Sequence, residues 1–351
     1  MGAKRRENTV IYGFLLLLAA SLFQGSFGLG MKKYQPFSWE AFWVVFSVIG
    51  ILLIPVGWTW LEVPAFMDYV RQTPAQVLLI ASFCGLLWGI SSILFGKAVD
   101  TIGVSLTYGI NMGISASLGS LIPLLIFGNI PPARSFTLLL IGMAVMLAGV
   151  VVITKAGLDK DKSGKTRQSE RHSGQGGMQG KGLSQGLLMA SFAGLGSAAM
   201  NIGFSYANQT LDIAARHGVA GVSASLIPWV ITLSGGFVAN FAYALYKLIR
   251  NRSYRDYMSA GSGKAYLKAI VTSFVWFFAL GFYAKATVML GPIGSSVGWL
   301  AFNGLALIVS NAWGLKDGEW RGFAGPQKWL LAGNVILIVS WIVVGISNSL
   351  A

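Results

Sequence analysis

Ten apolar stretches, each long enough to cross a bilayer, constrain the fold of this chain more than any other feature. A membrane-spanning helix needs about 20 mainly apolar residues, and the stretches that qualify are 9–29, 40–61, 75–97, 103–127, 136–154, 184–208, 220–247, 266–289, 293–315 and 327–348. Only 11% of the residues are charged, against roughly a quarter in soluble globular proteins. We therefore predict an all-α integral membrane protein with ten transmembrane helices.

The first stretch has a second interpretation. The basic residues at 4–6 followed by the apolar run 10–20 are also typical of a cleaved signal peptide. However, the apolar character continues to Gly30, which makes the stretch long enough to span. A first transmembrane helix is the favoured prediction.

Residues 155–183 interrupt the apolar pattern. They are polar, rich in Gly, Ser and Lys, and without apolar periodicity, which is typical of a flexible linker. We predict that they join a five-helix repeat at 1–154 to a second at 184–351. Because each half has an odd number of helices, the two halves would cross the membrane in opposite senses, as in transporters with inverted repeats.

A short pattern of residues occurs once in each half. Trp88 is followed nine residues later by Lys97 and six residues after that by Gly103. The same residue types at the same spacing recur 188 positions later, from Trp276 to Gly291. The identities are few, so coincidence is the alternative to duplication. Duplicated membrane proteins are most often transporters, and the pattern favours that class.

The basic residues indicate an orientation in the membrane. Of the 26 Lys and Arg residues, 19 lie in or beside connections on the same side as 155–183, and 7 lie on the side of both termini. Since Lys and Arg accumulate on the cytoplasmic side, we predict a cytoplasmic linker and external termini. The net charge of +14 lies in these connections, where it meets lipid head groups. We therefore predict lipid contact and no nucleic-acid partner.

Polar and aromatic side chains at membrane depth predict a binding site. Burying an amide without a partner is costly, so each amide must bond another helix or line a wet cavity. Taken singly, each Asn is better explained by a hydrogen bond between helices than by contact with a ligand. Together with aromatic rings they suit a sugar, because amides bond hydroxyl groups while a ring packs against the C–H face. The predicted substrate-binding residues are Trp88, Asn111, Asn201, Tyr283, Trp299 and Asn303.

Ionisable side chains are sparse and lie near the predicted helix ends. Glu40, Lys97 and Asp100 are the candidates for proton coupling or a gate. The alternative for Lys97 is that its ammonium group simply extends to the head groups, and an ion pair between Lys97 and Asp100 is a further possibility.

Several other chemistries find no support in the sequence. The single cysteine, Cys84, lies in an apolar stretch, and His172 and His217 lie in connections, so no metal site is predicted. No phosphate-binding Gly-Lys-Ser/Thr run and no nucleophile elbow occurs. We therefore predict neither an enzyme nor a bound cofactor.

Particular sequence segments carry a family resemblance. They are "MKKYQPFSWEAFW", "LLWGISSILFG" followed by "GVSLTYGINMGI", and the late "FYA…GPIGSSVGW…GLKDGEW". Through them the chain resembles the L-rhamnose–proton symporter family, a branch of the drug/metabolite transporter superfamily, over most of its length. The resemblance implies uptake of a deoxyhexose such as L-rhamnose across the bacterial inner membrane, with inward proton movement and alternating access.

Other functions remain as alternatives to that prediction. A transporter or exporter of another small metabolite, or a sugar facilitator that moves no protons, would use the same fold. An integral-membrane enzyme would need clustered His, Asp or Glu residues, and a sensor would bind a nutrient without transporting it. No oligomeric state is predicted.

Overall fold

The computed structural model describes residues 2–169 and 180–351, and within these ranges every regular element is a helix. Ten helices of the described chain are long and apolar enough to cross a membrane, which confirms the predicted multi-pass membrane fold. They are α1 (Gly2–Gly30), the continuous α2 (Trp39–Phe46), η1 (Ser47–Leu53) and α3 (Ile54–Glu62), α5 (Ala75–Ile102), α6 (Val104–Phe127), α7 (Ala133–Ser169), α8 (Gly180–Ala207), α11 (Ile227–Arg250), α12 (Ser262–Leu290), α13 (Gly294–Lys316) and α14 (Ala324–Ser349).

Short helices occupy the connections between the spans. These are α4 (Phe66–Gln72), α9 (Gln209–Arg216), α10 (Gly221–Ala224) and the 3₁₀ helix η2 (Ser253–Met258). Helix α1 runs without a break through the apolar run 10–20 to Gly30, as expected for a spanning helix.

Two of the connections between spans are tight, and each contains a glycine with a positive φ. Gly103, with φ of 86°, is the only residue between α5 and α6. Gly291, with φ of 91°, ends α12, and α13 begins three residues later. Residues with a Cβ adopt positive φ only with strain. The two glycines of the repeated pattern therefore make equivalent turns in the two halves.

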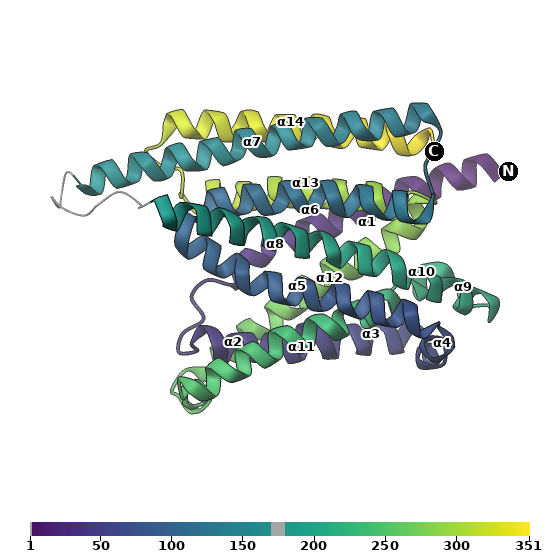
Figure 1. Cartoon of the computed structure of the whole chain (residues 1–351), viewed down its shortest axis with the longest axis horizontal. Coiled ribbons are helices and arrows are strands. Elements are labelled where there is room, and N and C mark those ends of the chain that lie inside the picture. The colour runs from purple at the N-terminus through teal and green to yellow at the C-terminus, as the bar shows by residue number, and fades with distance from the viewer. Residues whose placement is uncertain (1, 170–179) are drawn as a thin grey trace.

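The two halves interleave rather than forming separate bundles. Helix α5 packs along α8 and α11, and α12 packs in the same way along α1 and the α2–η1 segment. Helix α7 lies beside α14 on one side of the molecule, with α2, α3 and α11 on the opposite side (Figure 1). Each of these pairings has a counterpart in which the halves are exchanged, as two inverted repeats would require.

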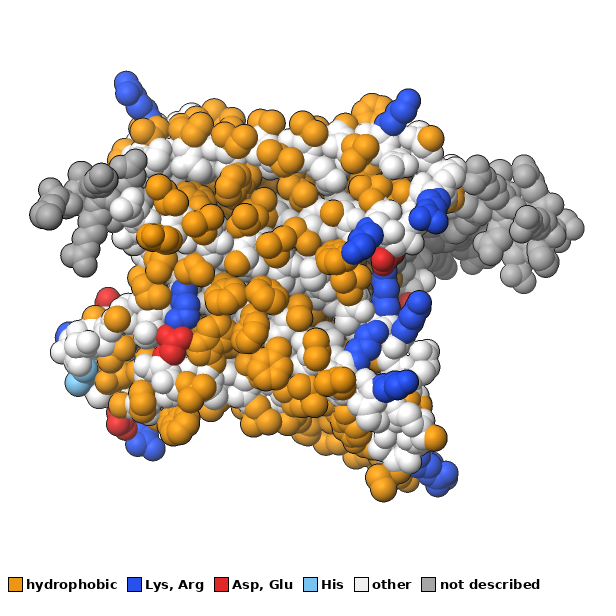
Figure 2. All heavy atoms as spheres, turned by 180° about the vertical axis from the view of Figure 1, so that it is seen from behind, with side chains coloured by type: hydrophobic (Ala, Val, Ile, Leu, Met, Phe, Trp, Pro, Cys, Tyr) orange, Lys and Arg blue, Asp and Glu red, His pale blue; other side chains and the backbone are white. Residues whose placement is uncertain are grey.

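The ends of the helices form two distinct sides. The C-terminus and the start of α1 lie at one end, which we call the terminus end (Figure 1). The end of α7 and the start of α8 lie at the opposite end, the linker end (Figure 1). Between the two ends the surface is largely apolar, and Lys and Arg side chains gather toward the ends (Figure 2). This distribution fits a protein surrounded by lipid.

The helices extend further into 155–183 than the sequence pattern predicts. Helix α7 continues to Ser169 and α8 begins at Gly180. The stretch 155–169 contains no proline, and its Lys residues are good helix formers, so a spanning helix can continue beyond the apolar region. Residues 170–179 lie outside the described residues. The division into two repeats joined by 155–183 stays a prediction.

Candidate functional site

A small cavity lies near the middle of the spanning helices, between six helices of both halves. Its volume is about 100 Å³. Helices α1, α5, α6, α8, α12 and α13 contribute its twelve lining residues, which are Gln24, Trp88, Asn111, Met112, Ser115, Ser197, Met200, Trp276, Leu280, Trp299, Phe302 and Asn303. Trp88 and Trp276 stand near the middle of their helices, so the cavity is remote from both ends of the molecule.

Four of the six predicted binding residues line this cavity. Trp88, Asn111, Trp299 and Asn303 come from α5, α6 and α13, and the fold brings them together across as many as 215 positions of sequence. All four were singled out because they are aromatic or amide side chains in apolar stretches. Their convergence around one hollow is the arrangement that the sequence predicts for a ligand.

The other two predicted residues, Asn201 and Tyr283, lie beside the cavity and bond each other. The Tyr283 hydroxyl donates to Asn201 Oδ1 at 2.6 Å, and Asn201 Nδ2 donates to the Gly119 carbonyl at 2.9 Å. Both side chains are fully buried. These bonds connect α6, α8 and α12 and satisfy the amide within the protein. Asn201 and Tyr283 therefore hold the cavity wall together in this conformation.

Stacked tryptophans form one wall of the cavity. The rings of Trp88 and Trp276 lie 5.6 Å apart between centroids with an interplanar angle of 14°. These are the two tryptophans of the repeated pattern, so equivalent residues of the two halves meet face to face. Trp299 also lines the cavity, and its indole nitrogen donates to the Ser115 carbonyl at 3.1 Å. Such rings present flat apolar faces with few rotatable bonds.

The amide groups at the cavity retain unused hydrogen-bonding capacity. Gln24 Oε1 is buried without a partner. Asn111 Oδ1 accepts from Ser197 Oγ at 3.2 Å, and Asn303 Nδ2 donates to the Trp299 carbonyl at 2.8 Å. No bond within the described chain engages Asn111 Nδ2 or Asn303 Oδ1. A buried polar group without a partner is costly, so these groups are available to a polar ligand.

No ionisable side chain is among the twelve lining residues. Amide donors and acceptors beside aromatic faces suit a neutral ligand that carries hydroxyl groups and apolar C–H surfaces. An ion or a strongly charged metabolite would lack a counter-charge at this site and would bear a large desolvation cost. The chemistry of the cavity therefore favours a neutral polyol.

The three predicted coupling or gate residues lie at the linker end, away from the cavity. Glu40 Oε1 accepts from Asn251 Nδ2 at 2.8 Å and from Ser253 Oγ at 2.5 Å, which ties the start of α2 to the end of α11. Lys97 and Asp100 are both exposed. No ion pair joins Lys97 to Asp100 among the described residues. The Lys97 ammonium group lies 5.9 Å from the centre of the Tyr243 ring.

An ion pair at the terminus end was not identified from the sequence. Lys285 Nζ lies 2.6 Å from Glu62 Oε2, and the two side chains are only 14% and 26% exposed. Trp58 Nε1 donates to Glu62 Oε1 at 2.6 Å, and the Lys285 ammonium lies 5.8 Å from the centre of the Trp58 ring. The pair joins α3 of the first half to α12 of the second. The repeated Trp–Lys pattern marked Lys285, but nothing in the sequence linked it to a carboxylate 223 positions away.

The comparisons with known proteins agree with this geometry. A family model described as L-rhamnose-proton symport protein matches residues 6–349. The chain is 27% identical over 325 residues to the L-rhamnose-proton symporter of Mannheimia succiniciproducens, covering 90% of this chain and 92% of that protein. It is 26% identical over 350 residues to the symporter of the same name from Cronobacter sakazakii, covering 97% and 98% of the two chains. With a membrane-spanning fold, a neutral central cavity and a family match over nearly its full length, the chain belongs to the L-rhamnose-proton symport protein family.

Proposed function

We propose that this protein is a secondary transporter that imports a deoxyhexose sugar, most directly L-rhamnose, together with protons by alternating access. The observation that carries the proposal is the uncharged cavity at mid-membrane depth, where aromatic faces and unsatisfied amides from both halves converge. The named relatives are L-rhamnose-proton symporters, which supports the same substrate here. A ten-helix chain in two halves also supports membership of the drug/metabolite transporter superfamily.

The size of the cavity supports a moving transporter rather than a rigid binding site. Its volume of about 100 Å³ corresponds to about three water molecules at roughly 30 Å³ each, whereas small-molecule sites usually measure about 300 Å³ or more. A monosaccharide must therefore enter through a wider conformation. In alternating access, the helices of one half shift against those of the other, and the cavity opens to each side in turn.

The proton must bind outside the cavity, because the cavity has no titratable group. Among the described carboxylates, Glu62 is the one whose ion pair lies mostly buried between the two halves. Protonation of Glu62 would neutralise its charge and release Lys285, which would loosen the contact between α3 and α12. We propose Glu62 as the coupling residue ahead of Glu40, Lys97 and Asp100.

The two ends of the molecule differ in a way that supports this assignment. Lys97 lies over Tyr243 at the linker end, as Lys285 lies over Trp58 at the terminus end. Glu62 lies four residues after Trp58, whereas the residue four positions after Tyr243 is Lys247. Among the described residues, the repeated lysine thus has a carboxylate partner at the terminus end and none at the linker end. A single acidic gate of this kind suits a transporter whose two sides face different proton concentrations.

The distribution of basic residues supports one orientation in the membrane. The bias toward the linker end supports a cytoplasmic linker and external termini in a bacterial inner membrane. Under that orientation the Glu62–Lys285 pair lies at the external side, where protons enter. A reporter fused after Ser169 would then show cytoplasmic activity, and periplasmic activity would reverse the orientation.

Transport by the purified protein in proteoliposomes tests the proposal. We expect radiolabelled L-rhamnose to accumulate inside when the outside is made more acidic, and to equilibrate without accumulation when the gradient is collapsed. Unlabelled deoxyhexoses should compete, whereas amino acids should not. Accumulation of another metabolite in place of L-rhamnose would refute the substrate assignment. Uptake of L-rhamnose that ignores the gradient would indicate a facilitator.

A further inference from the structure

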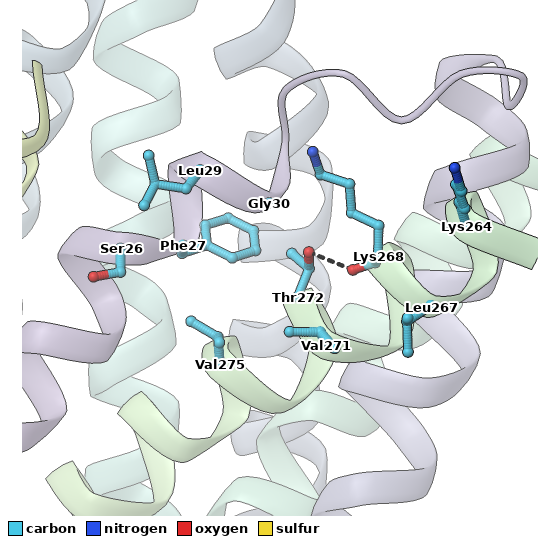
Figure 3. A pocket seen from close by; sticks show the side chains of 10 residues that line it. All are labelled: Ser26, Phe27, Leu29, Gly30, Lys264, Leu267, Lys268, Val271, Thr272 and Val275. Carbon is cyan, nitrogen blue, oxygen red and sulfur yellow. Dashed lines mark hydrogen bonds between the residues drawn. The ribbon is translucent and has the colours of Figure 1, made fainter. Parts of the chain in front are cut away.

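A second cavity opens on the side of the molecule, between α1 and α12 at the linker end (Figure 3). Its volume is about 430 Å³, and it is lined mainly by apolar side chains. Leu267 and Val271 on its α12 side are 63% and 51% exposed on the outer surface. The groove therefore opens sideways from the helix bundle, where the acyl chains of a bilayer would lie, and it is separate from the central cavity.

Close contact between the helices closes the far side of this groove. At Gly30 a Cβ atom would lie only 2.1 Å from Thr272 Oγ1, so only glycine lets the end of α1 approach α12 at this point. Phe27 and Val275 line the apolar interior beneath this contact (Figure 3). In this conformation the two helices therefore enclose an apolar recess between them.

Two lysines stand at the mouth of the groove without a carboxylate. The ammonium groups of Lys264 and Lys268 point out of the apolar interior (Figure 3). Lys268 Nζ donates only to the main-chain carbonyls of Lys32 and Lys33, which are neutral. Within the described ranges, no ion pair involves Lys33, Lys264 or Lys268, whereas the nearby Lys32 pairs with Glu319 at 2.7 Å. The mouth of the groove therefore carries uncompensated positive charge.

We propose that this groove binds one anionic phospholipid from the leaflet at the linker end. An acyl chain would lie against Phe27, Leu267, Val271 and Val275, and the phosphate would meet Lys264 and Lys268. Basic pockets between membrane helices on the cytoplasmic side have the charge and depth for such head groups. A zwitterionic lipid would bring a cation of its own toward the lysines, so the charge at the mouth selects for a net negative head group.

The position of the groove connects a bound lipid to the transport machinery. Helix α12 lines the groove with Val271 and Val275 and then contributes Trp276 to the central cavity. A lipid held between α1 and α12 would therefore brace the helix that forms one wall of the sugar site. This inference does not depend on which sugar is transported, because it rests on the groove and its charges alone.

Lipid binding by the full chain, purified in detergent, tests the proposal. Native mass spectrometry would measure retention of dioleoylphosphatidylglycerol and of dioleoylphosphatidylcholine, which share the same acyl chains. Each basic residue near a membrane surface contributes about fivefold to the affinity for anionic lipid. The double variant Lys264→Gln/Lys268→Gln should therefore bind phosphatidylglycerol with about 25-fold lower affinity, and its affinity for phosphatidylcholine should not change. The matched control is Lys328→Gln, which removes an exposed charge from the start of α14 at the same end.

A second variant and a soluble probe separate the remaining outcomes. Val271→Trp should fill the groove and block phosphatidylglycerol while leaving both lysines in place. Glycerol phosphate, which has no acyl chains, should not compete. Equal retention of both lipids, or a double variant that behaves like Lys328→Gln, would overturn the proposal. Effective competition by glycerol phosphate would also overturn it, in favour of a soluble anion.

Discussion

Replacement of Glu62 by Gln probes the proposed coupling directly. The variant keeps an oxygen that can accept from Trp58 Nε1, so the change is confined to the negative charge that faces Lys285 at 2.6 Å. Exposed ion pairs are worth about 0–1 kcal/mol, whereas breaking a buried pair costs about 3–5 kcal/mol. Because the two side chains are 14% and 26% exposed, we expect the variant to lose about 2 kcal/mol of the interaction that holds the terminus end closed, a value between these limits. That loss changes the equilibrium constant between the closed and open states of the terminus end by about 30-fold.

The assay must separate coupling from movement of the protein. Counterflow exchange of L-rhamnose across a proteoliposome membrane requires the helices to move but needs no net proton transfer. We expect Glu62→Gln to exchange sugar but to lose accumulation under an inward proton gradient. The matched control is Asp68→Asn, which removes an exposed carboxylate at the same end that pairs with Arg71 at 3.3 Å, and it should accumulate normally. Gradient-driven accumulation by Glu62→Gln at the unaltered level would refute the reasoning.

Three further outcomes are expected. Asn303→Ala and Trp299→Ala should each raise KM by about fivefold, the equivalent of one hydrogen bond or ring contact, with little loss of expressed protein; equal loss of transport and expression would indicate a folding role instead. Gly119→Ala should abolish uptake, because the new Cβ would lie 2.6 Å from Trp299 Nε1. The control Gly28→Ala should transport normally, because no atom lies within 4 Å of its Cβ. Normal uptake by Gly119→Ala would contradict the cavity geometry. Burial raises the pKa of Tyr257, in the connection between α11 and α12, to about 12. Because an unfolded tyrosine ionises near pH 10, Tyr257 should stabilise the fold fully below about pH 10 and lose that contribution as the pH rises to about 12. In a titration followed by tyrosinate absorbance, the Tyr257→Phe variant should lack one tyrosine that ionises late.

The spanning helices were predictable because their signal is local. A run of about 20 apolar residues has few alternatives to a membrane helix, and Gly103 and Gly291 mark tight turns through their own backbone freedom. The continuation of α7 to Ser169 was not predictable from hydropathy. A helix that leaves the membrane is maintained by its backbone bonds and its propensity, and neither requires an apolar pattern.

The candidate site was predictable in kind but not in detail. Polar and aromatic residues in apolar stretches identified Trp88 and Asn303, because a membrane makes such residues costly unless they serve a structure or a ligand. The same rule could not tell Asn201, which bonds Tyr283, from Asn111 at the cavity. The Glu62–Lys285 pair depends on how α3 meets α12, which is a property of the tertiary fold. The inverted repeat itself stays a prediction, supported by the stacking of Trp88 on Trp276.

Protection of the central cavity by sugar tests the central claim most directly. Met112 lines the cavity, and Cys84 is the single native cysteine, so a Met112→Cys variant in a Cys84→Ser background carries one thiol at the proposed site. The control places the thiol at Leu61, which is 73% exposed at the terminus end. We predict that L-rhamnose slows alkylation at position 112 and leaves position 61 unchanged. Labelling of position 112 at the same rate with and without L-rhamnose, in protein that transports the sugar, would contradict the account.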